Sequence, residues 1–412
     1  MKIAYYSHYF TPEIGAPSSR IYDLSQEWIR DGHEVQVATC FPNHPTGELY
    51  PGYRKQWYGR ESLDGIDVHR YWTYITPNKG FLKKTIGHVS FYPTAIAGAR
   101  HVGAPDVFIG TSPTFFAAMA AEKIARRQRR PFVMEVRDLW PALFVELGVL
   151  KNRFAISMLE KLELSLYRRA RRVVTVTEAF RRNLIERGVP ESKVAVIPNG
   201  ANVDFWREAG EGDALRTRLG LTDKFVVLYI GAHGISQALT SILRAAARLR
   251  DADEVRFVFV GEGAEKEKLL EFTRAEGLQN VIFLDPVGKA EVRAYYSAAD
   301  VCVVPLRDIP IFDTFIPSKM FEILAMQTPI VGSLRGEAAS ILESSGGAVV
   351  VPPENDEAIA NAIRELARDP SRRAAMGERG REFVIDHYSR SALAARYAAV
   401  LREAVAESAA AR

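Results

Sequence analysis

The sequence has 412 residues, of which 47% are hydrophobic and 25% are charged, and its formal net charge is +4. This length exceeds what one hydrophobic core usually organises, so two domains are expected. The composition is that of an ordinary globular protein, and the net charge is too small to indicate a nucleic-acid partner, so none is predicted.

Several features of the sequence predict a cytoplasmic location. Residues 1–10 have a strand-like pattern with one lysine and no long apolar core, which is not typical of a signal peptide. No window of the sequence reaches the length of a membrane span. Cys40 and Cys302 lie in separate apolar runs, so we expect them to be buried free thiols of a reducing compartment.

Strand-like and helical segments alternate through both halves of the chain. The apolar runs of the first half are KIAYYSH, HEVQVATC, IDVHRYW, PDVFIGT, PFVMEVRD, RRVVTVT and KVAVIP. After a polar stretch over residues 206–223, the pattern restarts with KFVVLYIG, EVRFVFVGEG, NVIFLDPV, DVCVVPL, TPIVGS and GAVVVPP. This rhythm predicts an α/β protein with two doubly wound parallel sheets, each of which binds ligands at the carboxyl ends of its strands.

The predicted domain boundaries follow from the turn and helix signals. A turn at residues 197–200 ends the first sheet, and the segment from residue 389 onward has helical periodicity. The sequence therefore predicts domains at residues 1–205 and 206–390, and a carboxyl-terminal helix at 391–412 that packs back on the first domain. We expect the two domains to face each other across a cleft.

Basic and aromatic residues are mixed in two segments of the first half, residues 42–57 and 78–92, the second of which contains Lys79, Lys83 and Lys84. This mixture suits a membrane interface with anionic lipids, and an ordinary active-site loop is the alternative. Arginines also cluster at residues 126–130 and 168–172. They are either solvated helix ends or a basic surface for anionic lipids or an anionic acceptor.

Two strand ends in the first half carry candidate site residues. Gly15 follows the first predicted strand, and a glycine there lets the backbone approach a phosphate, although many such turns contain glycine. Arg137 and Asp138 follow the strand that ends at Val136. Asp138 is a candidate base or substrate-orienting group with Arg137 as its charge partner, and a buried structural ion pair is the alternative.

The glycine turn at residues 230–236 is a second candidate phosphate cradle. Gly234 and the hydroxyl of Ser236 are its candidate donors, before a helix expected to start near Gln237, and a plain turn is the alternative. His233 in this turn is interpreted as a structural loop histidine.

Residues 305–332 hold the densest chemistry of the chain. A strand and a polar loop lead to a helix that is predicted to begin at Pro317, where free backbone N–H groups and the positive dipole end attract anions. Lys319 adds a positive charge next to Ser318, so we expect a nucleoside diphosphate compound to bind here. Glu322 is a candidate for ribose recognition or a dipole-stabilised helix acid. Asp313 is a candidate for contact with the rest of the donor.

The chain resembles the retaining glycosyltransferases of family 4, which have the GT-B fold. The resemblance covers nearly the whole chain and rests on PSKMFEILAMQTPIVG, GEGAEKEKL, AYYSAADVCVVPL, VIPNGANVDFW, GGAVVVPPENDEAIANAI and DPSRRAAMGERGREFV. PNHPTGELYPGYR and EVRDLWP resemble the branch that adds sugars to lipid-linked units of bacterial surface polysaccharides, including fucosaminyl and colanic-acid fucosyltransferases.

This resemblance implies a nucleotide-sugar donor, UDP-linked by expectation, net retention at the anomeric carbon, and neither a metal nor a cofactor. The first domain would bind a lipid-linked or saccharide acceptor, and the second would bind the donor. Peripheral contact with the anionic inner face of the cytoplasmic membrane is an accompanying expectation. The implied donor-binding residues are Gly15, Gly234, Ser236, Val287, Phe315, Ile316, Pro317, Ser318, Lys319 and Glu322. The implied acceptor-side residues are Tyr53, Arg54 and Arg137, and the implied catalytic residues are Asp138, Asp313, Lys319 and Glu322.

The carboxylate pair of the family is only partly present. Its second member falls on Glu322, whereas the first, usually a glutamate, falls on Thr314. The nearest acid is Asp313, which lies nine positions before Glu322.

The glycine turn of the second half lacks two cations that many relatives have, because Ala232 and Gln237 stand in their places. Lys319 is therefore expected to carry most of the diphosphate charge, aided by Arg307 or Arg20. A non-hydrolysing nucleotide-sugar 2-epimerase and a non-catalytic polysaccharide-assembly protein are the alternative functions.

Overall fold

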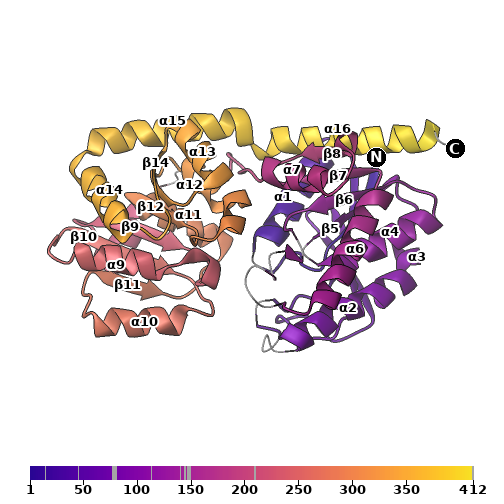
Figure 1. Ribbon diagram of the computed structural model, residues 1–412, viewed down its shortest axis with the longest axis horizontal. Helices are drawn as coiled ribbons and strands as arrows, with labels where there is room; N and C mark the ends of the chain where they lie inside the picture. The colour runs from indigo at the N-terminus through magenta and orange to yellow at the C-terminus, as the bar shows by residue number, and fades with distance from the viewer. Residues whose placement is uncertain are drawn as a thin grey trace. The chain divides into compact units, whose positions relative to one another are not determined.

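The computed structural model describes residues 1–410 except 14, 45, 77–80, 113, 140, 143–144, 146–149 and 208–209. The chain forms two compact units, Met1–Pro198 with Arg390–Arg412, and Asn199–Ser389 (Figure 1). The first boundary lies earlier than the predicted 205/206, because the intervening residues join the second unit. Ala201 pairs with Ser389 in an isolated bridge, and the ring of Trp206 packs 5.6 Å from that of Tyr296.

The first unit contains an eight-stranded sheet in the order β3-β4-β2-β1-β5-β6-β7-β8. Its strands are β1 Lys2–Tyr6, β2 Glu34–Cys40, β3 Tyr58–Leu63, β4 Ile66–Tyr71, β5 Val107–Thr111, β6 Phe132–Val136, β7 Arg172–Thr175 and β8 Val194–Val196. Every predicted strand of the first half is present, and the parallel pairing of β1 with β2 and β5 confirms the doubly wound arrangement.

The edge strand β3 corrects the prediction of a wholly parallel sheet, because it pairs antiparallel with β4. Its sequence, YGRESL, is too polar to give an apolar run. The turn that joins it to β4 contains Asp64 and Gly65, both with positive φ, of 49° and 84°. An Asp-Gly pair of this kind is typical of a tight hairpin and is the signal that could have found the strand.

The helices of the first unit are α1 Ala16–Arg30, α2 Phe81–Ala97, α3 Ala99–Val102, α4 Phe115–Arg127, α6 Arg153–Arg169, α7 Glu178–Glu186, α16 Arg390–Ala410 and the 3-10 helix η1 Glu191–Lys193. Figure 1 shows α16 in yellow running along this unit. The buried indole of Trp28 in α1 donates a 3.0 Å hydrogen bond to the carbonyl of Ala394, and Tyr397 packs edge-on against it. The last helix is therefore part of the first unit's core.

The second unit contains a six-stranded sheet in the order β11-β10-β9-β12-β13-β14, and all its pairs are parallel. Its strands are β9 Phe225–Ile230, β10 Val255–Val260, β11 Val281–Leu284, β12 Val301–Pro305, β13 Ile330–Ser333 and β14 Ala348–Val351. Each of the predicted apolar runs of the second half forms one of these strands.

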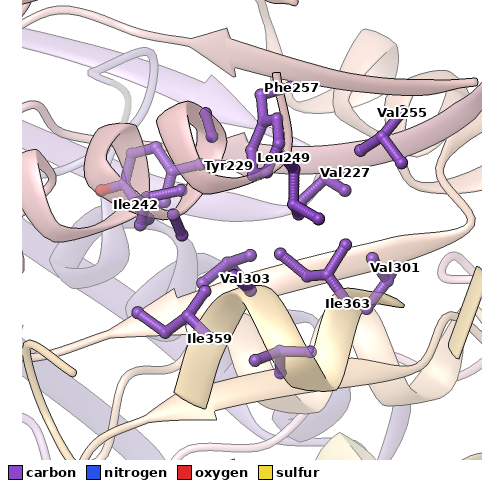
Figure 2. Packing of buried hydrophobic residues seen from close by; sticks show 14 of the residues in the cluster. Val227, Tyr229, Ile242, Leu249, Val255, Phe257, Val301, Val303, Ile359 and Ile363 are labelled. Carbon is purple, nitrogen blue, oxygen red and sulfur yellow. The ribbon is translucent and has the colours of Figure 1, made fainter. Parts of the chain in front are cut away.

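The helices of the second unit are α8 Gly212–Leu219, α9 Thr240–Arg248, α10 Lys266–Ala275, α11 Lys289–Ala298, α12 Lys319–Ala325, α13 Gly336–Ser345, α14 Asp356–Arg368, α15 Pro370–Tyr388, and the 3-10 helices η2 Ile235–Gln237 and η3 Pro310–Thr314. Figure 2 shows Ile242 of α9 and Ile359 and Ile363 of α14 packed against valines of the central strands. The polar stretch at 206–223 contains α8. Two expectations need correction, because the helix expected near Gln237 begins at Thr240 and α12 begins at Lys319 instead of Pro317.

The strand orders locate the ligand-binding edge of each sheet. The order in which successive strands are added to the sheet reverses between β1 and β5 in the first unit, and between β9 and β12 in the second, although all four strands run parallel to their neighbours there. Loops at such a switch point diverge to opposite faces and leave a crevice at the carboxyl ends of the strands. The predicted turns at Gly15, Gly234 and Asp313 all follow strands that border a switch point.

Candidate functional site

The loops at the second switch point bring Lys319 onto the first glycine turn of the second unit. The ammonium of Lys319 donates a 2.7 Å hydrogen bond to the carbonyl of Ile230 and lies 4.4 Å from the centre of the Tyr229 ring. Gly231 has φ of 139°, and a Cβ atom added there would lie 2.5 Å from Nζ of Lys319. A cation from α12 therefore contacts the backbone turn after β9, although 89 residues separate Lys319 from Ile230.

The electrostatics of Lys319 favour an anionic ligand. Loss of hydration lowers the pKa of Lys319 to about 8, and the negative charge of Glu322 partly opposes this shift. Burial also raises the pKa of the thiol of nearby Cys302, so this group is neutral near pH 7. A phosphate placed against the ammonium would stabilise its charged form.

Glu322 lies on the same helix as Lys319, three residues further along the chain. Burial raises the pKa of the neighbouring Tyr296 phenol, and the charge of Glu322 raises it further. The carboxylate of Glu322 is half-buried, in a helix whose other side chains are mostly buried. Its assignment to a ribose diol stays a prediction.

The segment before α12 is organised less by the helix dipole than the sequence predicted. Ser318 is the N-cap residue and its side chain makes no capping hydrogen bond. The amides of Met320 and Phe321 donate to the carbonyls of Pro317 and Ser318, at 3.1 and 3.3 Å. Because these local bonds use the second and third amides of a seven-residue helix, the charge of Lys319 carries more of the anion attraction.

The two residues before Pro317 are also half-buried. The ring of Phe315 packs against Phe312 with 5.5 Å between centroids, and Ile316 follows it in the chain. Both lie in the loop between β12 and α12, so they belong to the same strand end as Lys319.

Backbone hydrogen bonds join the loops after β9, β10 and β12. The amide of His233 donates to the carbonyl of Glu262, and that of Arg307 donates to the carbonyl of Ser236, both at 2.9 Å. Gly234 precedes η2, which contains Ser236. Val287, in contrast, follows β11, the outermost strand on that side of the sheet. The structure thus brings Gly234, Ser236 and Arg307 to the switch point, and places Val287 two strands away from β9.

His233 lies among the rings of Tyr229, Phe259 and Phe283. Its side chain is fully buried, and among the described residues neither ring nitrogen has a hydrogen-bond partner. Burial, reinforced by the charge of Lys266, lowers the pKa of His233 to about 4. The imidazole is therefore neutral, which agrees with its interpretation as a structural histidine.

Asp313 is held by a neighbour within the second unit. Its carboxylate forms a 3.2 Å ion pair with Arg335, and its carbonyl lies against Gly336, where an added Cβ would approach it to 2.0 Å. The hydroxyl of Thr314, the residue at the usual glutamate position, donates to the carbonyl of Ile311 at 2.7 Å. Contact between Asp313 and a donor sugar stays a prediction, and it would compete with Arg335.

Arg137 and Asp138 follow β6 next to Ser112, which follows β5. The hydroxyl of Ser112 accepts hydrogen bonds from the amides of Arg137 and Asp138, at 2.8 and 3.4 Å. Burial raises the pKa of Asp138 to about 6, and the charge of Arg137 only partly opposes this. The Arg137 side chain is 9% exposed, and its Nε and Nη1 atoms have no hydrogen-bond partner among the residues described.

The buried ion pair of the first unit uses Arg20, which corrects its expected role. Nε of Arg20 lies 3.0 Å from a carboxylate oxygen of Glu135, and both side chains are fully buried. The same guanidinium donates to the carbonyls of Ile197 and Pro198, at 2.9 and 2.8 Å. Glu135 also accepts hydrogen bonds from Tyr5 and, at 2.9 Å, from Thr111. Arg20 is thus committed to the core and is not available to a diphosphate.

The turn before α1 contains a buried acid that the sequence analysis did not single out. Gly15 is the N-cap residue of α1, and two positions earlier Glu13 accepts hydrogen bonds from the amides of Phe10, Asn43 and His44. Burial raises the pKa of Glu13 to about 7 against the effect of these bonds. Its sequence signal is weak, because an acid near the start of a helix is common.

The other two predicted acceptor residues lie next to β3, the strand at one side of this sheet. Tyr53 and Arg54 precede β3, whereas Arg137 follows β6, beyond β1 and β5. The phenol of Tyr53 donates to Glu61 at 3.2 Å, and the guanidinium of Arg70 lies 5.0 Å from its ring centre. Arg54 is exposed.

The remaining expectations concern metals and membranes. Among the described residues, no group of three or more histidine, cysteine or acidic side chains is arranged to hold a metal ion. In the same residues, every helix is too short or too polar to cross a membrane. The predicted interface segment at 78–92 lies partly outside the described residues, including Lys79, and the rest of it enters α2.

Comparison with known proteins gives consistent matches along the chain. Residues 15–200 match the Glycosyl transferase 4-like domain, and residues 224–369 match the domain of Glycosyl transferases group 1. WcaI of Escherichia coli (strain K12), named for a glycosyl transferase role in colanic acid biosynthesis, is 28% identical over 380 residues, which cover 89% of this chain and 92% of WcaI.

Solved structures match over almost the whole length. Sucrose-phosphate synthase of Thermosynechococcus elongatus has a TM-score of 0.78 at 19% identity, and covers 98% of this chain and 99% of its own. HepE of Anabaena, solved in complex with UDP and glucose, has a TM-score of 0.74 at 18% identity, with the same two coverages of 98% and 99%. At these identities the likeness establishes the fold.

Proposed function

The chain belongs to the family 4 glycosyltransferases with the GT-B fold, and from this premise we propose which transfer it carries out. The donor is a UDP-linked hexose or aminohexose, and the acceptor is a hydroxyl of a lipid-linked saccharide in bacterial surface polysaccharide synthesis. Transfer proceeds with retention at the anomeric carbon and without a metal ion.

The observation that carries this proposal is the meeting of Lys319 with the Gly231 turn at the second switch point. The ammonium is partly dehydrated and already bonded to the Ile230 carbonyl, so it is held in place before a ligand arrives. A fixed cation beside a glycine turn suits a diphosphate, whose charge grows as the sugar leaves. We assign hydrogen bonds with the ribose to Glu322, which lies on the same helix.

The names of two similar proteins support the substrate classes. WcaI is named for colanic acid biosynthesis, and on this basis we propose that the product belongs to a bacterial surface polysaccharide. HepE has been solved with UDP and glucose, which makes UDP the proposed leaving group. Membrane contact is proposed because a lipid-linked acceptor lies at a membrane surface.

The proposed chemistry exchanges one bond at the anomeric carbon. The bond to the diphosphate oxygen breaks, and the acceptor oxygen forms a new bond on the same face of the sugar. The acceptor proton passes to the departing phosphate oxygen, so the nucleoside diphosphate leaves with the electron pair of the broken bond. Lys319 stabilises this leaving group, and Asp138 orients the reacting sugar through hydrogen bonds.

A donor and acceptor screen tests the proposed function. Nucleotide sugars are first ranked by the thermal stabilisation that they give the full chain, and transfer to diphosphate-lipid acceptors is then followed by mass spectrometry. We expect a product heavier by one sugar, an anomeric configuration equal to that of the donor by NMR, and unchanged turnover in EDTA. An inverted product would contradict retention, and loss of turnover in EDTA would contradict metal independence.

The same screen separates the alternative functions. Conversion of a nucleotide sugar without any acceptor would indicate an epimerase. Binding of a nucleotide sugar without transfer, across a broad panel of acceptors, would indicate an assembly protein with no catalytic activity. Either result would replace the proposed transfer.

Substitution of Lys319 tests the role of its charge. We expect Lys319→Ala to lower turnover by at least about 10²-fold, because it removes a stabiliser of charge that develops in the transition state. Steady-state kinetics with the best donor measures the effect. Lys268→Ala is the control, because this lysine of the same unit is 66% exposed and pairs with Glu265 on the surface of α10. Near-normal turnover of Lys319→Ala would remove Lys319 from the site.

A further inference from the structure

A basic cavity of about 860 Å³ lies in the first unit, at the amino ends of its strands. Pro131 and Phe132 at the start of β6, Arg172 at the start of β7 and Lys193 before β8 contribute to its wall. Donor and acceptor chemistry in this fold class uses the carboxyl ends of the strands. The cavity therefore lies at the amino ends of these strands, whereas Arg137 and Asp138 follow the carboxyl end of β6.

Positive charge dominates the lining of the cavity. Its basic side chains are Arg126, Arg130, Arg168, Arg169, Arg171, Arg172 and Lys193, and its acidic side chains are Glu122 and Glu407. Helices α4 and α6 both end here, and arginines in the last turn of a helix are stabilised by its dipole. That stabilisation accounts for Arg126, Arg168 and Arg169, but not for the four cations that belong to strand ends and loops.

The two acids do not neutralise this set. Glu122 is shared between Arg126 and Arg169, at 3.5 and 3.6 Å. Glu407 is likewise shared between Arg171, at 2.9 Å, and Arg172, which also pairs with Glu403 at 3.3 Å. Each carboxylate therefore serves two guanidinium groups, and the remaining cations need other partners.

The remaining cations have weak partners or none. Arg130 lies 3.9 Å from Asp106, and the ammonium of Lys193 donates to the carbonyls of Arg168 and Ala170, at 2.9 and 3.1 Å. The side chain of Arg168 has no hydrogen bond or ion pair with any described residue. Arg172 is paired through its other two nitrogens, but its buried Nε atom has no hydrogen-bond partner in the described part of the chain. Donors thus remain for a ligand.

We propose that this cavity binds a compact anion that carries phosphoryl groups. Guanidinium groups from different strands and helices offer paired N–H donors, which match phosphate oxygens better than single charges do. The volume exceeds that of one phosphate and suits a diphosphate or a phosphorylated head group. Both a soluble phosphate compound and an anionic phospholipid could supply this chemistry.

The test measures pyrophosphate binding to a variant in which Lys319→Ala weakens binding at the proposed donor site. Inorganic pyrophosphate is titrated by calorimetry into full-length Lys319→Ala protein, alone and with Arg130→Gln/Arg168→Gln. These two substitutions leave both arginine partners of each acid in place, so folding should be retained, and circular dichroism checks this. Arg127→Gln/Arg182→Gln is the matched control, because it removes the same charge from exposed positions of the same unit that do not line the cavity.

We expect saturable binding that weakens at least about tenfold in the cavity variant and stays unchanged in the control. Flotation with phosphatidylglycerol vesicles, with phosphatidylcholine vesicles for comparison, then distinguishes the source. Vesicle binding that pyrophosphate displaces would indicate a lipid head group, and pyrophosphate binding without flotation would indicate a soluble ligand. Absence of pyrophosphate binding, or equal weakening in the cavity and control variants, would overturn the proposal.

Discussion

The residues near the two switch points differ in how many of their polar atoms already have partners within the fold. Arg20 and Glu135 satisfy each other in the core, and Asp313 is held by Arg335. Arg137 instead keeps buried donors without partners among the described residues, and burial lowers its pKa. A buried guanidinium with open donors is costly without a ligand, so we predict that an anionic or hydroxyl-rich acceptor supplies partners for Arg137.

Asp138 should make the first unit less stable as its charge forms. Its pKa is raised from 3.8 to about 6 by burial, so between these values the folded state holds a proton that the unfolded state has lost. Stability from this group is therefore present below about pH 4 and is lost as the pH rises to about 6. Asp138→Asn should remove this slope and raise the free energy of unfolding at pH 7 by about 1–3 kcal/mol.

Urea unfolding between pH 4 and 7 measures this difference, with Glu186→Gln on an exposed face of the first unit as the charge-matched control. In the same variant we expect kcat to fall about 10²-fold, because the amide cannot replace a carboxylate that orients the sugar. A small effect on kcat would argue against both candidate roles of Asp138, and a retained pH slope would contradict its buried state.

At the scale of elements, the donor-side site depends on glycines that let loops approach one another. Gly261 follows β10 and has φ of 143°, and an added Cβ would lie 2.0 Å from the carbonyl of Gly231. A Cβ atom added at Gly231 would in turn lie 2.5 Å from Nζ of Lys319. Side chains at either site would separate β9 and β10 loops that the structure joins through His233 and Glu262.

Gly261→Ala should therefore lower both stability and turnover. The strained φ and the contact with Gly231 together should cost about 2–4 kcal/mol, and displacement of the turn should raise KM for the donor. Gly277→Ala separates the two causes, because Gly277 also has positive φ, of 61°, but no atoms within 4 Å of an added Cβ. Equal effects of the two variants on KM would show that strain alone, and not loop contact, explains the result.

At the scale of the whole molecule, the first unit is closed by the last helix of the chain. Leu393, Tyr397 and Leu401 of α16 belong to the same buried cluster as Trp28 and Val37. Arg171 and Arg172 also pair with Glu407 near the end of this helix. The first unit therefore requires a segment that is synthesised after the entire second unit.

Leu401→Ala should destabilise the first unit by about 2–5 kcal/mol, because it leaves a cavity in a fully buried core. Its neighbour Arg402 is exposed, so Arg402→Ala should change stability by less than about 0.5 kcal/mol. Hydrogen exchange, resolved by peptide, measures protection in each unit. Loss of protection in β9 to β14 instead of β1 to β8 would contradict the assignment of α16 to the first unit.

The sequence alone determined the fold class, the strands of both sheets except β3, and the family, because apolar runs and glycine turns are local signals. It also identified Lys319, Glu322 and Asp138 as candidates from their places at strand ends. Helix starts were less well predicted, as at Lys319 and Thr240. Before Thr240, the 3-10 helix η2 at Ile235–Gln237 resembles the start of an α-helix in sequence. Before Lys319, Pro317 suits a first helical turn but lies two residues ahead of α12.

Only the tertiary structure decided which residues meet. It joined Lys319 to the turn of Ile230 and Gly231, because the switch point between β9 and β12 aligns loops that are distant in the chain. It also showed that Arg20 pairs with Glu135 in the core and does not belong to the donor site. Arginines from the two sequence clusters, at residues 126–130 and 168–172, line one cavity. Charge and burial depend on neighbours from several strands, so no local pattern could have specified these pairings.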